Sequence, residues 1–117
     1  MLRIYFPQSL LNFLLRKSNR EDESGFYLIG FDFGDQIEVI DAIEFSYKEQ
    51  SGVFVESLPE QRGLLNLAVI EGLKILGTFH THPFTEGEPS PSPTDLRNFQ
   101  IHKDTLLMIA SGSGDLF

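Results

Sequence analysis

Residues Ile75–His82 predict a strand, because the run contains Ile, Phe and two Thr, which favour sheets. Side chains of a strand alternate between its two faces with a period of two. One predicted face carries Leu76, Thr78, His80 and His82. The two imidazoles then lie side by side and point the same way. The segment therefore predicts a sheet in which one strand ends with two neighbouring imidazole side chains on the same face.

A carboxylate, Asp95, follows the two histidines after an irregular loop, Pro83–Pro91, that is rich in Pro and Gly. Two neutral histidines and one carboxylate, with a fourth position left for water, form the ligand set of a catalytic zinc ion. The chain has no Cys, so it cannot build a closed thiolate site. We therefore predict one Zn²⁺ per chain on His80, His82 and Asp95. Fe²⁺, Mn²⁺ or Ni²⁺ could occupy the same ligands in vitro.

The segment Ser92–Asp95 also has a structural explanation. Ser92 suits the N-cap of a helix, Pro93 the first helical position, and Asp95 the third position of a capping box. A His-x-His pair at a strand end, taken alone, is more often incidental than metal-binding. The cap and the metal site are compatible, because a cap holds the carboxylate in one place, as a ligand requires.

Composition indicates one soluble globular domain that spans residues 1–117, with 22% charged and 41% hydrophobic residues. A formal net charge of −8 disfavours nucleic acids and anionic membranes as partners, since both are bound through Lys and Arg. No apolar run is long enough to cross a membrane, and Met1–Asn19 does not read as a signal peptide. Together with the absence of Cys, these features lead us to expect a cytoplasmic protein.

Helical and strand patterns alternate along the chain. We expect helices at residues 7–19, 59–74 and 93–101, and strands at residues 26–33, 37–47, 53–55, 75–82 and 105–110. The strand at 37–47 is expected to place four apolar side chains on one face, namely Ile37, Val39, Ile43 and Phe45. Such alternation predicts an α/β fold in which helices pack on a sheet.

Around His80-Thr81-His82-Pro83 and Ser92-x-x-Asp95 the chain resembles the JAMM metalloproteases, also called MPN-plus or JAB domains, and especially their prokaryotic members. The family pattern is a distant Glu, then His-(Ser/Thr)-His-Pro, then Ser-x-x-Asp. The distant Glu corresponds to Glu23, because Glu23–Gly30 is similar to the Glu-x-Gly-x-x-Leu-x-Gly segment that leads into the family's first strand.

The resemblance implies a cytidine-deaminase-like fold with a mixed sheet flanked by helices. It also implies a zinc-dependent isopeptidase or peptidase, in which Glu23 takes the proton from water and Ser92 stabilises the oxyanion. Asp22 replaces Glu23 if the strand register slips by one. The implied substrate is the amide bond after the C-terminal tail of a ubiquitin-like or sulfur-carrier-like protein.

The chain departs from the family in two respects. Its loop Pro83–Pro91 is longer than usual, and the chain ends earlier than family members usually do. A domain that is short at its C-terminus is a natural minimal form, a truncated form, or part of an assembly that completes the sheet. If the chain is complete, we expect the strand at residues 105–110 at or near a sheet edge, with a second copy or another protein paired to it. Two alternative functions stay open at this point: a non-catalytic scaffold, or a peptidase of cell-wall or phage-structural peptides.

Overall fold

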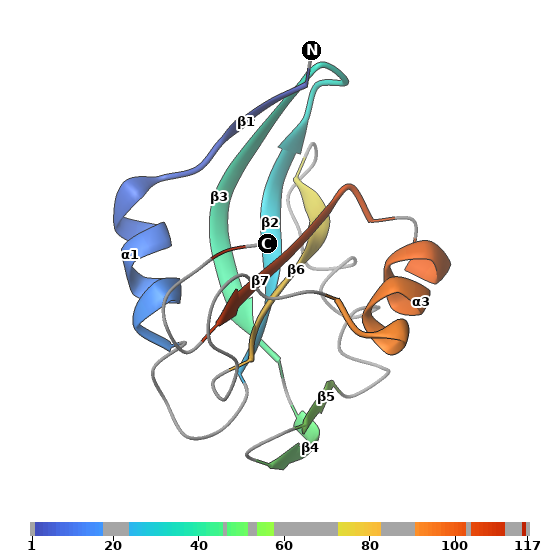
Figure 1. Ribbon diagram of the computed structural model, residues 1–117. Helices are drawn as coiled ribbons and strands as arrows, with labels where there is room; N and C mark the ends of the chain where they lie inside the picture. The colour runs from blue at the N-terminus through green and yellow to red at the C-terminus, as the bar shows by residue number, and fades with distance from the viewer. Residues whose placement is uncertain are drawn as a thin grey trace.

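The computed structural model describes residues 2–17, 24–45, 47–51, 54–57, 73–82, 91–102, 104–111 and 116. These ranges contain a five-stranded sheet and a separate two-stranded sheet, together with helices (Figure 1). The elements are β1 (Arg3–Tyr5), α1 (Gln8–Lys17), β2 (Gly25–Asp32), β3 (Gln36–Glu44), β4 (Tyr47–Ser51), β5 (Phe54–Ser57), β6 (Lys74–His82), α3 (Pro93–His102) and β7 (Leu106–Ser111).

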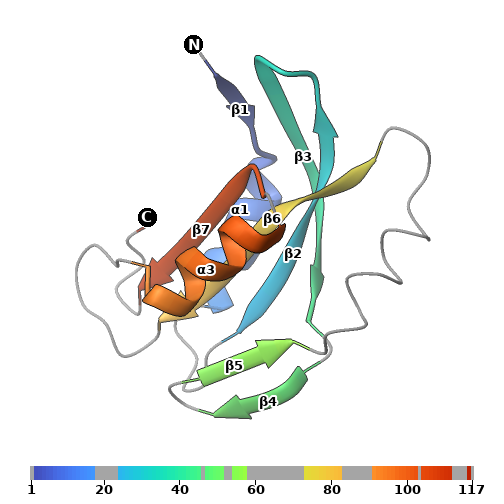
Figure 2. The ribbon, with the colours of Figure 1, turned by 90° about the vertical axis from the view of Figure 1, so that its right-hand side faces the viewer.

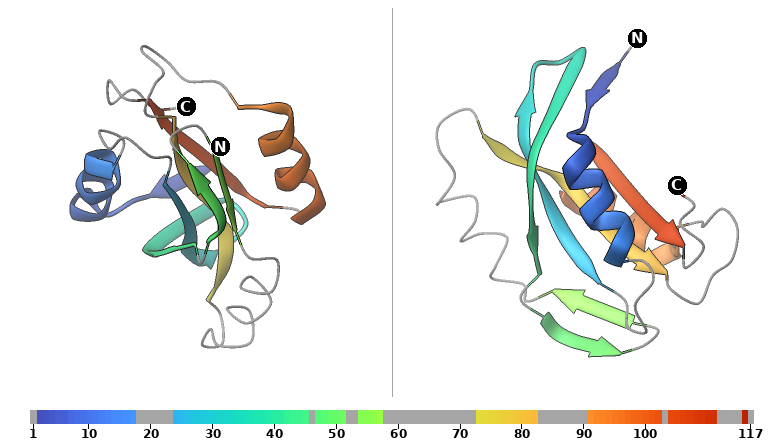
Figure 3. Two further views of the ribbon diagram at one scale, coloured as in Figure 1. Left: turned by 90° about the horizontal axis from the view of Figure 1, so that it is seen from below. Right: turned by 90° about the vertical axis from the view of Figure 1, so that its left-hand side faces the viewer.

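The large sheet is mixed and has the strand order β1-β3-β2-β6-β7. Strand β2 is antiparallel to both β3 and β6, whereas β1 and β7 run parallel to their neighbours. Helix α1 lies against one face of this sheet and α3 against the other (Figures 2 and 3). The expected α/β architecture, a mixed sheet flanked by helices, is therefore confirmed.

Most expected elements that fall on described residues agree with the structure to within a few residues, but one strand was not expected and one expected strand differs. Strand β1 is missing from the expected elements, because three exposed residues carry no periodic signal. The expected strand at 37–47 is divided, since β3 ends at Glu44 and β4 begins at Tyr47. The helix expected at 59–74 falls largely outside the described residues, and its last position, Lys74, belongs to β6.

A β-bulge in β3 divides the face that the sequence predicts for Ile37, Val39, Ile43 and Phe45. An extra residue in a strand shifts the alternation by one position, so the side chains beyond it change face. Before the bulge, Ile37 and Val39 are buried in the core. After it, Ile43 pairs with Tyr27, and the ring of Phe45 lies 4.5 Å from that of Tyr27, outside the core cluster. The prediction of one shared face is therefore wrong.

A second bulge in β6 corrects the prediction for Leu76. Its neighbours Ile75 and Gly77 pair with consecutive residues of β2, so Leu76 is the extra residue. Leu76 is fully buried in the core cluster and does not share the face of the two histidines. The histidines follow the bulge and keep their alternation with Thr78.

The core lies between the sheet and α1, and the opposite face near the end of β6 is left for polar side chains. The buried cluster consists of Leu14, Phe26, Leu28, Ile37, Val39, Leu76, Phe79, Leu106 and Ala110. No helix in the described part of the chain is long and apolar enough to span a bilayer.

Strand β7 is at one edge of the sheet, as expected, and within the described residues its outer side is bridged at Ala110 by Leu116. That a second copy or another protein covers this edge stays a prediction. Light scattering at micromolar concentrations would test the self-pairing form, and a clean monomer would count against it.

Candidate metal centre

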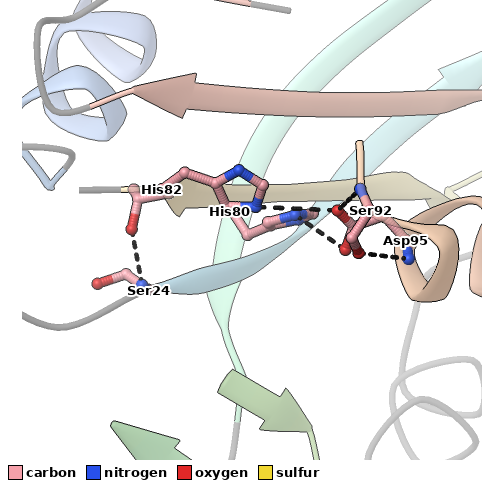
Figure 4. Close-up of polar contacts among 6 residues, drawn as sticks. Ser24, His80, His82, Ser92 and Asp95 are labelled. Atoms are coloured by element: carbon pink, nitrogen blue, oxygen red, sulfur yellow. Dashed lines mark hydrogen bonds and ion pairs between the residues drawn. The ribbon is translucent and has the colours of Figure 1, made fainter. Parts of the chain in front are cut away.

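Two elements that are separated in sequence bring the expected ligands together (Figure 4). His80 and His82 come from the last residues of β6, and Asp95 comes from the first turn of α3. One ligand atom from each residue can be chosen so that all three lie within 4.8 Å of one another. His80 is buried, and the other two side chains are partly buried.

The distances between these atoms fit ligands that share one small cation. His80 Nε2 lies 3.1 Å from Asp95 Oδ1, and His82 Nε2 lies 3.8 Å from Asp95 Oδ2. In a tetrahedral zinc site with bonds of about 2.0–2.1 Å, ligand atoms are roughly 3.3 Å apart. His80 Nε2 is buried and has no well-directed hydrogen bond among the described residues, in spite of the nearby carboxylate. A buried ring nitrogen without a hydrogen bond is suited to bind a metal ion, which would satisfy it.

Asp95 is held by a reciprocal pair of hydrogen bonds at the start of α3. Its backbone N–H donates to Ser92 Oγ at 3.1 Å, and the backbone N–H of Ser92 donates to Asp95 Oδ2 at 2.8 Å. This arrangement is a capping box with Asp in place of Glu. The cap expected from the sequence is therefore present, and it fixes the carboxylate that faces the two histidines.

The environment favours the charge states that metal ligands need. Burial alone would raise the pKa of Asp95, but the neighbouring His80 side chain and the hydrogen bonds from Ser92 outweigh it and lower this pKa to about 2. The pKa of His82 is lowered by burial and by His80, against the opposing effect of Asp95. An ionised carboxylate and a neutral imidazole are the forms that bind metal.

Of the two predicted catalytic residues, Ser92 belongs to the described part of the chain and Glu23 does not. Ser92 lies beside the cluster, and its Oγ accepts a hydrogen bond, which leaves the hydroxyl proton to be donated. Glu23 and its alternative Asp22 lie outside the described residues. Ser24, the residue bonded covalently to Glu23, is described and is 3% exposed.

Thr81 contributes a contact that the sequence alone did not reveal. The sequence places it on the face opposite the histidines, and the structure agrees, because it pairs with the core residue Ala110. Its Oγ1 accepts a hydrogen bond of 2.8 Å from the backbone N–H of Ser24. In return, the backbone N–H of Thr81 donates to the carbonyl of Ser24 at 2.9 Å. The only signal in the sequence is a hydroxyl residue between two ligand histidines.

The chain is similar to known proteins in its sequence and in its fold. The family described as prokaryotic homologs of the JAB domain matches residues 8–116. A JAB1/MPN domain protein from Archaeoglobus fulgidus has a crystal structure that is similar at 25% identity, with a TM-score of 0.53, over 98% of this chain and 82% of that one.

A protein from Desulfitobacterium hafniense, known from its solution structure, is similar at 22% identity, with a TM-score of 0.63, over 95% of this chain and 75% of that one. At that identity the likeness concerns the fold alone. A comparison with curated proteins gives no match.

Proposed function

The chain belongs to the family of prokaryotic homologs of the JAB domain, and we propose that it is a zinc-dependent peptidase or isopeptidase. The observation that carries the proposal is the convergence of His80, His82 and Asp95 within 4.8 Å. Imidazole and carboxylate side chains are common zinc ligands. Three protein ligands leave the fourth coordination position of zinc for water or substrate.

A zinc ion bound there would acidify a water molecule and polarise the carbonyl of the scissile amide. Glu23 would take a proton from the water as the water oxygen bonds to the carbonyl carbon. It would later give that proton to the amine nitrogen as the C–N bond breaks. The Ser92 hydroxyl would donate a hydrogen bond to the developing oxyanion, while its Oγ keeps the hydrogen bond from the Asp95 N–H. The residues thus divide the work between holding the metal, moving the proton and stabilising charge.

The substrate that we propose is the amide bond after the flexible C-terminal tail of a ubiquitin-like or sulfur-carrier-like protein. An extended tail can bind by adding a strand to a sheet edge. Apart from the bridge between Ala110 and Leu116, strand β7 is such an edge, and it lies next to β6, which carries both histidines. In register, His82 pairs with Ser111, so the metal cluster lies one strand in from this edge.

The first test measures metal and cleavage on the same samples. Elemental analysis should give about one zinc per chain, and single-turnover assays should show cleavage of a fusion between a ubiquitin-like domain and a reporter peptide. His80→Ala and Asp95→Ala should lose most of the metal and the activity together, since each removes a ligand. Glu23→Gln should keep the metal and lose about 10²–10⁴-fold in rate, because an amide cannot take the proton.

Asp22→Asn is the matched control, because it removes a neighbouring acid from the same segment. Loss of activity in Asp22→Asn but not in Glu23→Gln would move the proton transfer to Asp22. Full zinc occupancy after both ligand substitutions would disprove the metal site. If the zinc-loaded protein cleaves cell-wall peptides and not the fusion, the proposed substrate is wrong and cell-wall peptides take its place. If it cleaves neither, the result favours a scaffold function.

A further inference from the structure

We infer that Thr81 is a positioning residue that sets the orientation of Glu23 through the backbone of Ser24. The inference rests on the proposed function, because it assigns Thr81 a part in the same reaction. Thr81 is fully buried on the face opposite the metal ligands, so it touches neither metal nor substrate. Its effect on the reaction has to pass through the residue that it holds.

The contact acts on the peptide group that connects Ser24 to Glu23. The nitrogen that donates to Thr81 Oγ1 is the Ser24 amide, and this amide is one half of the Glu23–Ser24 peptide bond. The six atoms of a peptide unit lie in one plane, and the Cα of the preceding residue is among them. A hydrogen bond that fixes the Ser24 N–H therefore constrains the plane through which Glu23 is attached.

The hydrogen-bond pattern at this position differs from that of a regular ladder. In an antiparallel sheet, two residues that form a hydrogen-bonded pair exchange two backbone bonds. Thr81 N–H donates to the Ser24 carbonyl in the usual way, but Ser24 N–H donates to the threonine side chain. Because β2 begins at Gly25, this side-chain acceptor lies where the chain joins the sheet. The threonine therefore holds Ser24, the described residue that precedes β2 and to which Glu23 is covalently bonded.

Placement on the opposite face separates this role from metal binding. Gly25 pairs with His80, and Ser24 is bonded to Thr81, so the attachment point of Glu23 lies beside the strand segment that carries both ligands. The ligands point to the α3 side, whereas the Thr81 side chain points to the core. Loss of the hydroxyl should leave the ligand set unchanged and alter the placement of the proton acceptor.

The test uses Thr81→Val, which keeps the shape but has no acceptor, and Thr81→Ser, which keeps the hydroxyl. The cleavage assay is that of the ubiquitin-like fusion, and zinc is measured on the same samples. We expect zinc content and KM of Thr81→Val to equal those of the parent, and kcat to fall about 10- to 100-fold, since a misplacement near 1 Å costs about 10²-fold. Thr81→Ser should recover most of kcat.

A readout that does not depend on activity is hydrogen exchange at the Ser24 amide. This N–H should exchange faster in Thr81→Val than in the parent and regain its protection in Thr81→Ser. Ile37→Val is the control, because it trims a buried residue of β3 that pairs with Asp32, at the other end of β2 from Gly25. It should lower stability and leave both kcat and Ser24 exchange unchanged. If Thr81→Val does not fold, Thr81→Cys takes its place, because it keeps a similar side-chain volume and its Sγ is a weaker acceptor than a hydroxyl. It should show the same changes in kcat and in Ser24 exchange, but smaller ones.

The decisive comparison is a double-mutant cycle with Glu23→Gln. If Thr81 acts through Glu23, Thr81→Val should cost less than about 2-fold in the Glu23→Gln background, because coupled residues are not additive. An equal fold-loss in both backgrounds would overturn the inference and leave Thr81 with a general structural role. An active parent whose Thr81→Val variant keeps full kcat would also overturn it. A zinc-loaded parent that does not cleave identifies instead a failure of the proposed function, and the positioning role fails with it.

Discussion

Asp95 combines two roles that are usually found in different residues. As the third residue of α3 it accepts the backbone N–H of Ser92, and as a neighbour of both imidazoles it can hold a metal. The cap restricts the carboxylate before any ion binds, so less side-chain entropy remains to be lost on binding. The same pair of residues thus starts the helix and shapes the site.

For Ser92, the helix cap can be separated from the oxyanion role by comparing two substitutions. Ser92→Ala should lower the free energy of unfolding by about 1 kcal/mol, whereas Gly is tolerated at an N-cap and should lower it by only a few tenths. Both variants lack the hydroxyl, so both should lose about 10²-fold in kcat and keep their zinc. Thermal unfolding and single-turnover cleavage of the same samples give the two quantities.

A loss of activity that follows the loss of stability would contradict this separation. In that case Ser92→Gly would remain close to the parent in kcat, and the serine would serve only as a helix cap. Zinc content near that of the parent in both variants is the internal control, because neither substitution removes a ligand.

At the scale of elements, one glycine in the sheet and one in a turn between its strands are needed for different reasons. A Cβ added to Gly77 in β6 would lie 1.7 Å from the carbonyl oxygen of Leu106 in β7, so the two strands can approach only because the side chain is absent. Gly34, between β2 and β3, has a φ of +91°, but a Cβ there would meet nothing within 4 Å. One glycine is required by packing and the other by backbone conformation.

The two positions make a matched pair of alanine substitutions. Gly34→Ala should lower the free energy of unfolding by about 1–2 kcal/mol, the usual cost of a left-handed conformation for an L-residue. Gly77→Ala should cost more than about 3 kcal/mol, the upper end for overpacking, because backbone of β7 would have to move. Denaturant unfolding would measure both, and similar losses would mean that β6 and β7 are less tightly paired than they are here.

At the scale of the whole molecule, one face of the sheet packs the core and part of the other carries the candidate metal ligands. The core cluster lies on the α1 side, and the three ligand residues lie on the α3 side. A metal on His80, His82 and Asp95 would connect the end of β6 to the start of α3. Binding at this place would therefore stabilise the folded chain as a whole.

Removal of the metal should lower the thermal stability of the protein. A ligand at 100 times its Kd stabilises the folded state by about 2.7 kcal/mol. For a domain of this size that corresponds to a shift in Tm of roughly 10 °C. Calorimetry with zinc and with a chelator should show this difference for the parent and almost none for Asp95→Ala. An equal shift in both proteins would place the stabilising ion somewhere else.

The sequence by itself determined the features that depend on residues a few positions apart. The period-two pattern of β6 predicted that His80 and His82 share a face, and Ser92 with Asp95 predicted a cap whose two hydrogen bonds span three residues. Such features follow from local geometry, because the repeat of a strand and the first turn of a helix are fixed by adjacent residues.

Only the tertiary structure decided the features that depend on pairing between distant segments. The bulges in β3 and β6 moved Ile43 and Leu76 to faces that their own strands did not predict. The bond from Ser24 to Thr81 joins residues 57 positions apart, and no local pattern marks it. A strand's register depends on which partner it meets, and one extra residue there reverses every side chain beyond it.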